Sequence, residues 1–398
     1  GIVGAWAAYE LARAGCSVEV LDADLGERSA SFGNAGILAQ SYAKPMSNPR
    51  NLLAGMRSVL GSGHDVEVVR PLGFATLRWL LRFGVDSRPF RASAAAEDVS
   101  RMTRRSIELY EELASREGMD LGLRRTGWLY VAHTPSALRQ QQALALEMAR
   151  IGIRSEMLSA DGVHNLEPSL DPALVGGVLY TDDSSMDPGR IVTTVREAAR
   201  RHGANFVEGC VEAADLERGR VRGLLTASGE TVTADQFVLA GGAGCAALGR
   251  MVGVRIPVER GTGWSLTVPT PEPLAGRALM GIEDHVVINP DARSIRITGG
   301  MRFGGEIGQL PPPGHLAALR ASAERILPAL GDVQEPGEGW MGARPMTTTG
   351  LPIVRRVNPT TIVVTGHGTL GMTLAPESGV QVRRLILGAC SSEQEALP

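Results

Sequence analysis

The chain has 398 residues, enough for two domains that each bury a core, with room for a ligand cleft between them. Its formal net charge of −3 is nearly balanced and both signs are scattered along the chain, which argues against nucleic acid as a partner. The four cysteines show neither CxxC nor Cys/His spacing, so we expect no metal site, no disulfide framework and a reducing compartment.

The chain opens with the pattern of a βαβ unit. Residues 4–14 carry apolar side chains at helical spacing, and residues 18–22 follow as a buried strand that ends at Asp22. Gly1 and Gly4 match the second half of a GxGxxG fingerprint, whose glycines let the backbone approach a pyrophosphate. Asp22 is placed to bind a ribose hydroxyl, and an acid there disfavours NADP. The alternative is a tight turn with a solvated acid. The first strand of the unit would precede Gly1, so we expect the true N-terminus upstream.

The middle of the chain is rich in strands. Asp187-Pro188 predicts a helix start, because an acid can cap the helix and proline suits its first turn. The other expected elements are helices over 97–116, 135–151, 314–330 and 378–387 and strands over 128–132, 256–268, 286–300 and 361–365, with short strands within 205–240. A βαβ start and a strand-helix finish around this middle favour a discontinuous nucleotide domain with a substrate domain inserted in it.

Three glycine-rich segments follow expected strands. Residues 29–36 form a loop of small residues that can run beside a flat ring or phosphates. Residues 239–244 place glycines after an apolar strand, where a doubly wound sheet meets its cofactor. Residues 366–373 can open a helix whose N-terminus favours partial negative charge on a ligand. The alternatives are an ordinary surface loop for the first segment and a tight turn for the second.

Arg344 lies between small residues and a proline in Trp-Met-Gly-Ala-Arg-Pro. Its planar guanidinium suits a bidentate pair with a carboxylate, which lysine cannot reproduce. The alternative is an arginine that is solvated or paired within the protein. His367 on its own is more typical of a structural histidine than of a catalytic one. No Ser/His/Asp order and no paired-carboxylate pattern stands out.

Taken together, these segments resemble the D-amino-acid oxidase superfamily of flavoproteins, the DAO family, and most closely its bacterial D-amino acid dehydrogenases. The resemblance spans nearly the whole chain in the right order. Its most specific parts are WxGxRP at 340–345 with Gly-Leu-Pro-Ile at 350–353, and Gly-His-Gly-Thr-Leu-Gly-Met-Thr at 366–373. The segment Asn34-Ala35-Gly36 adds to it, whereas the opening glycine turn fits many dinucleotide folds.

The resemblance implies an α/β fold. A Rossmann-like FAD-binding domain of the glutathione-reductase type would carry an inserted α+β substrate domain built on a mostly antiparallel sheet, with the flavin ring at the interface. We expect the FAD-binding domain over 1–50, 160–254 and 340–398, and the substrate-binding domain over 51–159 and 255–339.

The resemblance also implies an activity. FAD, held noncovalently, would take a hydride from the substrate Cα at flavin N5, so that a D-amino acid yields a 2-oxo acid and ammonia. Arg344 would pair with the substrate carboxylate, and Tyr42 and His367 complete the expected catalytic set. The expected cofactor contacts are Gly1, Gly4, Asp22, Asn34, Ala35, Gly36, Val211, Gly241, Gly242, Gly366, Gly368, Thr369 and Leu370.

Departures from the family pattern keep alternatives open. Gly261 to Trp264 differ from the usual wall of the substrate pocket, so an oxidoreductase of D-hydroxyproline, glycine or sarcosine type is the alternative among enzymes. Thr349 replaces an acid, and one flavin or structural contact is expected to be lost there. Arg344 stands where monomeric sarcosine oxidases carry the cysteine that bonds the flavin, which argues against covalent attachment. The alternative of another class is a flavin-binding electron-relay subunit of a hetero-oligomer.

The expected partners are a small-molecule amino acid and an electron acceptor, either a quinone or oxygen. No apolar run reaches the length of a membrane span. We expect a cytoplasmic protein, with peripheral contact at the inner face of the cell membrane left open. Oligomeric state and the particular amine are not encoded in any motif.

Overall fold

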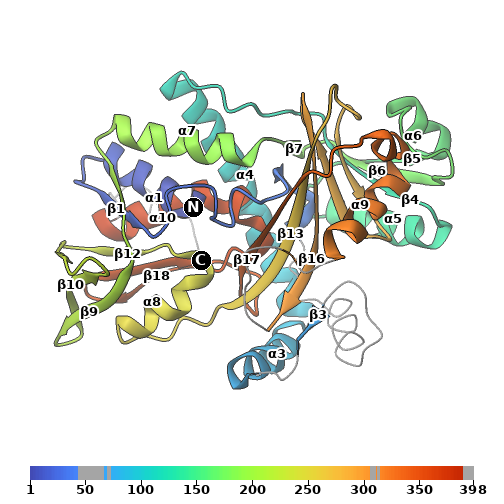
Figure 1. Ribbon diagram of the computed structural model, residues 1–398. Coiled ribbons are helices and arrows are strands. Elements are labelled where there is room, and N and C mark those ends of the chain that lie inside the picture. Colours follow the sequence, from blue (N-terminus) through green and yellow to red (C-terminus); the bar gives the residue numbers. More distant parts are fainter. Residues whose placement is uncertain (44–66, 70–72, 305–310, 312–313, 389–398) are drawn as a thin grey trace.

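The computed structural model describes residues 1–43, 67–69, 73–304, 311 and 314–388 of the protein. Figure 1 shows a helix-rich part with short strands beside a part built on one large twisted sheet. In the described ranges, no helix combines the length and the apolar character of a membrane span.

The first helix and its following strand form as predicted. α1 (Ile2–Arg13) begins directly after Gly1, and β1 (Glu19–Asp22) pairs in parallel with β8 (Asn205–Glu208). The other strands of this part are β9 (Val211–Glu217), β10 (Arg220–Thr226), β11 (Thr231–Val232), β12 (Phe237–Leu239), β18 (Ile353–Asn358) and β19 (Thr361–Thr365). β12 and β19 are a second parallel pair, while β9, β10 and β11 form an antiparallel sheet. Parallel pairs joined through helices are the α/β pattern that the sequence predicts.

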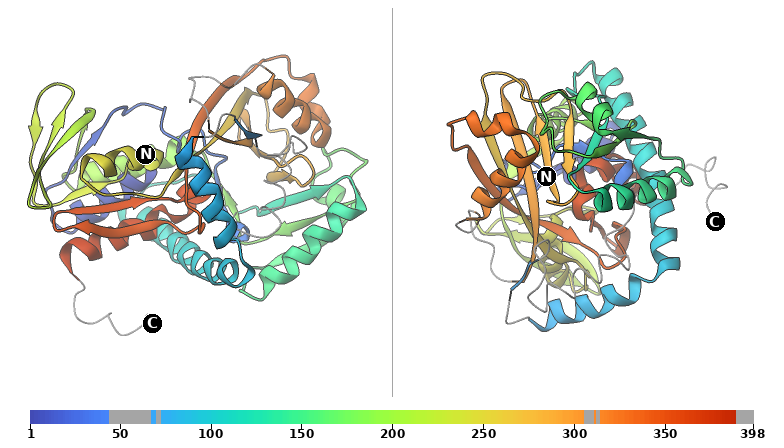
Figure 2. Two further views of the ribbon diagram at one scale, coloured as in Figure 1. Left: turned by 90° about the horizontal axis from the view of Figure 1, so that it is seen from below. Right: turned by 90° about the vertical axis from the view of Figure 1, so that its right-hand side faces the viewer.

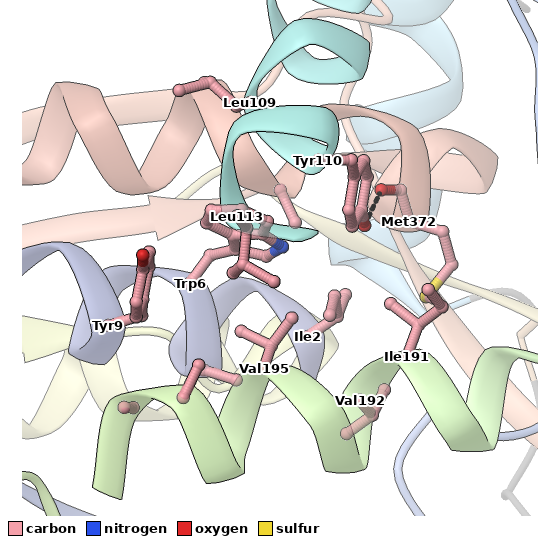
Figure 3. Close-up of a cluster of buried hydrophobic side chains, with 14 of the residues drawn as sticks. Ile2, Trp6, Tyr9, Leu109, Tyr110, Leu113, Ile191, Val192, Val195 and Met372 are labelled. Carbon is pink, nitrogen blue, oxygen red and sulfur yellow. Dashed lines mark hydrogen bonds between the residues drawn. The ribbon is translucent and has the colours of Figure 1, made fainter. Parts of the chain in front are cut away.

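A core of large apolar side chains holds α1 against three further helices (Figure 3). These helices are α4 (Pro89–Glu117), α7 (Pro188–Arg201) and α10 (Gly371–Leu387). Trp6 of α1 packs edge to face on Tyr110 of α4, with 5.3 Å between ring centroids. Asp187 caps α7 by accepting hydrogen bonds from the N–H groups of Gly189 and Arg190, which confirms the predicted helix start. This core fixes α1 and α7, the two helices that reach the glycine turn.

The last helix differs from its prediction. The sequence predicts a helix over 378–387 and a separate helix opening within 366–373, whereas one continuous helix, α10, begins at Gly371 and contains Pro376. Proline has no N–H for the carbonyl of Met372, four residues earlier. The hydroxyl of Tyr110 donates a hydrogen bond to that carbonyl at 2.7 Å (Figure 3). A side chain from α4 therefore replaces the missing backbone bond and lets the helix run through the proline.

The large sheet forms the second part of the molecule. Its strands are, in spatial order, β17 (Glu338–Met346), β13 (Glu259–Pro269), β16 (Ser294–Phe303), β15 (Val286–Pro290), β14 (Ala278–Gly281), β4 (Trp128–Ala132), β6 (Gly176–Tyr180) and β5 (Ser155–Ser159), with β3 (Glu67–Val68) beside β16. Only the pairs β14–β4 and β3–β16 are parallel. The mostly antiparallel sheet is thus confirmed. Figure 2 shows α9 (His315–Ile326), which packs against β13, β15 and β16.

Smaller elements complete the described chain. They are β2 (Ile37–Leu38), β7 (Ser184–Ser185), the 3-10 turn η1 (Ser41–Ala43), α3 (Phe74–Asp86), α5 (Pro135–Ala149), α6 (Ala160–Leu166) and α8 (Cys245–Met251). β2 pairs with β7, and α5 and α6 pack against β6. The helices predicted over 97–116 and 135–151 correspond to α4 and α5. The helix predicted over 314–330 corresponds to α9 followed by a short 3-10 turn.

Several elements of one expected domain pack with elements of the other. β6 and most of β17 lie in the segments expected to bind FAD, 160–254 and 340–398, yet both pair within the large sheet. The second half of α4 lies in the expected substrate segment 51–159, yet its side chains join the core around α1. The boundary at residue 50 is outside the described residues. The division of the chain at these positions therefore stays a prediction.

Candidate active site

A cavity of ≈ 1880 Å³ runs from the start of α1 to the large sheet. Ordinary small-molecule pockets measure roughly 300–1,000 Å³, so this one has room for a dinucleotide and a substrate together. The predicted site residues that line it are Gly1, Gly4, Asp22, Asn34, Ala35, Tyr42, Val211, Gly241, Gly242, Arg344, His367, Gly368, Thr369 and Leu370. Gly36 and Gly366 are absent from its wall and lie within the segments that form it.

The glycine turn brings backbone to one end of the cavity. A Cβ on Gly1 would lie 3.2 Å from Ser31 Oγ, and one on Gly4 would lie 3.4 Å from the Cβ of Ala240. Small residues therefore let α1 pack closely on the neighbouring strand and loop. The first N–H groups of α1 have no partner inside the helix, which makes this end suited to phosphate oxygens. The Ile2 N–H donates to Ser31 Oγ at 3.0 Å.

Arg196 of α7 is a buried cation at this end of the cavity that the sequence analysis missed. Its side chain is 7% exposed and lies among the lining residues, with Nη1 donating to the carbonyl of Leu25 at 2.6 Å. Nη2 lies 3.9 Å from Asp22 Oδ2 and has no hydrogen-bond partner. Ser29 Oγ, in the cavity wall, is also buried without a partner. Because buried polar atoms are normally satisfied, these orphaned atoms fit the ribose and phosphate oxygens of FAD.

The loop that carries Asn34 and Ala35 closes one side of the cavity. Asn34 Oδ1 accepts a hydrogen bond from the Gly36 N–H at 2.8 Å, so this side chain shapes its own loop. Gly36 has a positive φ of 74°, and a Cβ there would lie 2.3 Å from the Met186 carbonyl. No other residue type fits that position without moving the backbone.

Two side chains of the large sheet hold this loop. Asn289 Nδ2 donates to the carbonyl of Ala35 at 2.8 Å, and Arg296 Nη1 donates to the carbonyls of Phe32 and Asn34. Burial lowers the pKa of the Arg296 guanidinium, which has carbonyl partners and no described carboxylate in an ion pair. The sheet therefore fixes the loop that lies between the two parts of the molecule.

The segment after β19 passes under the cavity. Gly366 and Gly368 have positive φ values of 82° and 54°, which explains the glycines of this motif. The ring of His367 is buried, and its Nε2 lies 2.8 Å from Ser378 Oγ of α10. Burial lowers the pKa of His367 to about 4, so the ring is neutral near pH 7. Its assigned catalytic role stays a prediction, while its contact with α10 shows how it fixes the glycine segment.

Arg344 lies at the opposite end of the cavity, on β17. Its Nη1 donates to the carbonyl of Gly300 at 2.9 Å and lies 3.8 Å from Met301 Sδ. Among the described residues no carboxylate forms an ion pair with it, and burial lowers the pKa of the guanidinium. A Cβ on Gly263 of β13 would lie 2.4 Å from Arg344 Cζ. The absence of a side chain at Gly263 therefore leaves space for this guanidinium.

Tyr42 lines the same end of the cavity as Arg344. Burial raises the pKa of Tyr42, and the charge of Arg344 opposes that rise. Tyr42 also lines a small cavity together with Met346, which follows Arg344 by two residues on β17. Its ring lies 6.3 Å from that of Trp128, measured between centroids. Trp128 also lines the cavity, and its buried Nε1–H has no partner. The sequence analysis assigned Trp128 only to a strand, because a single tryptophan in an apolar run carries no further signal.

The remaining predicted contacts lie near the glycine turn. Val211 begins β9 and lines the cavity together with Cys210. Gly241 and Gly242 follow β12, and Thr365 Oγ1 donates to the carbonyl of Gly242 at 2.8 Å. The structure thus gathers the predicted cofactor residues along one cavity and places Arg344 and Tyr42 at its far end.

Comparison with known proteins identifies the family. The DAO family model, described as FAD dependent oxidoreductase, matches residues 1–385. The chain belongs to this family of FAD-dependent oxidoreductases. The family confirms the enzyme class, the α/β fold and FAD as the cofactor that the motifs predicted.

Curated relatives cover almost the whole chain. The D-amino acid dehydrogenase of Cereibacter sphaeroides is 33% identical, over 100% of this chain and 92% of that protein. The D-amino acid dehydrogenase of Methylobacterium nodulans is 31% identical, over 98% of this chain and 94% of that protein.

Solved structures share the fold of this DAO-family chain. Glycine oxidase from Geobacillus kaustophilus has a TM-score of 0.76 and 23% identity, covering 97% of this chain and 92% of that one. Iminodiacetate oxidase from Chelativorans sp. BNC1 has a TM-score of 0.75 and 21% identity, covering 98% of this chain and 94% of that one. At these identities the likeness speaks for the fold alone.

Proposed function

We propose that the protein catalyses the FAD-dependent oxidative deamination of D-amino acids, giving a 2-oxo acid and ammonia. The observation that carries this proposal is Arg344, a guanidinium at the sheet end of the cavity that lacks a carboxylate partner among the described residues. A desolvated guanidinium recognises a carboxylate strongly and in one orientation. The D configuration is supported by the curated relatives, which are named D-amino acid dehydrogenase.

The chain supplies binding and orientation to this reaction. Arg344 would hold the substrate carboxylate, and Tyr42, whose raised pKa keeps its hydroxyl protonated, would donate a second hydrogen bond. FAD, when bound, supplies the electron sink for oxidation of the amine. Arg196, the start of α1 and the loop around Asn34 would hold the cofactor, so that the two ends of the cavity set the distance between substrate and flavin.

The cofactor attachment that we propose is noncovalent. The described cysteines that line the cavity are Cys16 and Cys210, which adjoin β1 and β9 at the glycine-turn end. At the other end of the cavity, Arg344 of β17 occupies the position where monomeric sarcosine oxidases carry the cysteine that bonds the flavin. Protein precipitated with acid should therefore release its flavin into the supernatant, and flavin retained in the pellet would contradict noncovalent binding.

The substrate end of the cavity favours an apolar side chain. Its wall includes Trp79, Trp128, Trp264, Met280, Val287 and Met301. The carboxylates among the described lining residues, Glu19, Asp22 and Asp235, lie on or beside β1, β11 and β12 and away from Arg344. An apolar wall gains free energy by covering an apolar side chain, which glycine and sarcosine lack.

Anaerobic flavin reduction tests the proposal. FAD-loaded protein is mixed with D- and L-leucine, D-methionine, D-alanine, D-aspartate, glycine, sarcosine and D-hydroxyproline, and loss of oxidised flavin absorbance is followed. We expect reduction by apolar D-amino acids, a loss of at least about 100-fold in kcat/KM in Arg344→Lys, and wild-type behaviour in Arg355→Ala, which changes an exposed arginine of β18. Reduction by none of the panel would overturn the proposal. Reoxidation of the reduced protein by oxygen or by a soluble quinone then identifies the acceptor.

A further inference from the structure

A buried carboxylate outside the cavity holds the chain just before Tyr42. Asp183 follows β6, is 1% exposed and is not part of the cavity wall. Its Oδ1 accepts hydrogen bonds from the N–H of Gln40 at 2.7 Å and from the N–H of Ser41 at 3.1 Å. Its Oδ2 accepts a hydrogen bond from the hydroxyl of Ser41. One side chain thus fixes two consecutive residues, and Tyr42 is the next.

Within the described part of the chain, no basic side chain forms an ion pair with Asp183. The groups that face it are Tyr130 of β4, Tyr180 of β6 and the adjacent Asp182, whose own carboxylate pairs with Arg154. Burial is the largest effect on Asp183 and raises the pKa of its carboxyl to about 7, while the hydrogen bonds from Ser41 and Gln40 oppose that rise. A buried carboxylate costs free energy that an apolar or amide side chain would not. Its presence therefore calls for a role beyond filling space.

Few residues separate the backbone that Asp183 holds from the proposed substrate site. Tyr42 lies in η1 directly after Ser41, lines the same cavity as Arg344, and shares a second small cavity with Met346 of β17. On the other side, Trp128 of β4 packs against its ring. The position of Tyr42 is therefore set by the packing of its ring, which includes Trp128, and by the backbone that Asp183 holds.

We propose that Asp183 is a positioning residue that fixes Tyr42 beside Arg344 and so sets how tightly the amino acid binds. This inference rests on the proposed function, since it assumes that Tyr42 contacts the substrate. Above the pKa of Asp183 the ionised carboxylate accepts all three hydrogen bonds. Below it, the added proton weakens the acceptor, so substrate binding weakens as the pH falls through about 7.

Amide hydrogen exchange tests, without any substrate, whether Asp183 holds the backbone of Gln40 and Ser41. Asp183→Ala removes both acceptor oxygens, and Asp182→Ala is the matched control, because it removes the neighbouring carboxylate and its ion pair with Arg154. We expect the amides of Gln40 and Ser41 to exchange at least about tenfold faster in Asp183→Ala and at the wild-type rate in Asp182→Ala. Equal exchange in the two variants would overturn the inference whether or not the enzyme is active.

A double-mutant cycle tests the link to binding. The dissociation constant and limiting rate for D-leucine are measured by anaerobic flavin reduction in wild type, Asp183→Ala, Tyr42→Phe and the double variant. We expect Asp183→Ala to raise the dissociation constant about tenfold with a smaller change in rate, and to add little in the Tyr42→Phe background. Additive effects would show that Asp183 acts through another group, and the inference would fail.

The pH profile separates positioning from folding. Asp183→Asn keeps Oδ1 for the two N–H groups and cannot titrate. Being neutral, its amide resembles the protonated carboxyl, so we expect its dissociation constant for D-leucine to equal that of the wild type below pH 7 and to stay at that value up to pH 8; a wild-type profile in this variant would overturn the inference. This variant also serves if Asp183→Ala does not fold. Absence of reduction by D-leucine in the wild type would instead count against the proposed function. The exchange experiment would then still show whether Asp183 holds the backbone of Gln40 and Ser41.

Discussion

Gly263 and Arg344 cross where the substrate carboxylate is proposed to bind. A Cβ added at Gly263 would lie 2.4 Å from Arg344 Cζ, so Gly263→Ala displaces the guanidinium while its charge remains. We expect the dissociation constant for D-leucine to rise about tenfold, or ~1.4 kcal/mol, because a bidentate pair depends on orientation. Stability should change little, since the displaced atoms are the end of a flexible side chain. Anaerobic flavin reduction at a series of D-leucine concentrations gives the constant.

Gly331→Ala is the control for that substitution. Nothing lies within 4 Å of a Cβ at Gly331, and its φ is not in the positive range. It should bind D-leucine as the wild type does. If Gly263→Ala does so too, the position of Arg344 in the structure is not the one that binds the carboxylate.

His367 makes stability depend on pH in a known direction. Burial lowers the pKa of its ring from 6.5 to about 4, so the native state binds fewer protons than the unfolded state between these values. The contribution is complete above pH 6.5 and is lost as the pH falls through 4. His367→Gln keeps a side-chain group able to pair with Ser378 and does not titrate. Between pH 7 and 4, we expect the free energy of unfolding to fall by about 3 kcal/mol more in the wild type than in the variant, measured with denaturant.

The same variant tests the catalytic role assigned to His367. A ring held neutral against Ser378 positions the glycine segment and transfers no proton near pH 7. The pH dependence of the flavin reduction rate should therefore show the same kinetic pKa values in the wild type and in His367→Gln. Loss of a kinetic pKa in that variant would assign His367 to the chemistry instead.

Single residues differ in how far the sequence reveals them. Arg344 stands in a long motif, so its position at the cavity was predictable from neighbours in the chain. Asp183 meets Ser41 across 142 positions, and the pairing of β2 with β7 brings their segments together. Arg196 carries a weaker signal, because it stands four residues after Val192 and three before Ala199 on the buried stripe of α7. A charge at core-facing spacing marks a residue that needs a buried partner.

At the scale of elements, α10 depends on a hydroxyl from α4. Tyr110→Phe leaves the Met372 carbonyl without a partner, because Pro376 has no N–H to offer. An unsatisfied buried carbonyl costs about 1–3 kcal/mol, so we expect the free energy of unfolding to fall by that amount. Pro376→Ala supplies an N–H at the right place and should recover at least half of the loss in the double variant. Thermal or denaturant unfolding of the four proteins measures this.

No recovery in the double variant would mean that the hydroxyl acts elsewhere than on that carbonyl. The dependence also explains the error in the predicted helix start. The proline and glycines within 371–379 predict a break in the helix. Tyr110, whose hydroxyl bonds the Met372 carbonyl and so allows the helix to continue, lies 262 positions from Met372 in the sequence. The strand over 128–132 was predictable because its five consecutive residues are apolar, a local pattern that needs no distant partner. All five are buried in the structure.

At the scale of the whole molecule, the cavity joins two sets of contacts made by different parts of the chain. The glycine-turn end is built from α1, β1 and α7, and the other end from β13, β17 and η1. Asn289 and Arg296 of the large sheet hold the loop that runs between them. The order of motifs predicts both ends, because the glycine segments follow strands and the Arg344 motif is specific in sequence. Their distance apart is set by the loop contacts, which no local pattern encodes.

This separation predicts that cofactor and substrate binding can be altered independently. Arg196→Met keeps the length of the side chain at the glycine-turn end and removes its charge. We expect the dissociation constant for FAD to rise about tenfold, because the orphaned Nη2 would no longer meet the adenosine half of the cofactor. Titration of the apoprotein, followed by flavin fluorescence, measures this. The stabilisation of the apoprotein by ADP should fall in step.

Arg201→Met is the matched control, since Arg201 is an exposed residue of the same helix that pairs with Glu197. It should bind FAD as the wild type does. Once Arg196→Met is saturated with FAD, its dissociation constant for D-leucine should equal that of the wild type, because Arg344 and Tyr42 lie at the far end of the cavity. Weaker binding of D-leucine at full FAD occupancy would show that the two ends are coupled through the loop that Asn289 and Arg296 hold. Unchanged FAD binding would instead exclude Arg196 from the cofactor site and limit it to its contacts within the protein, with Asp22 and the Leu25 carbonyl.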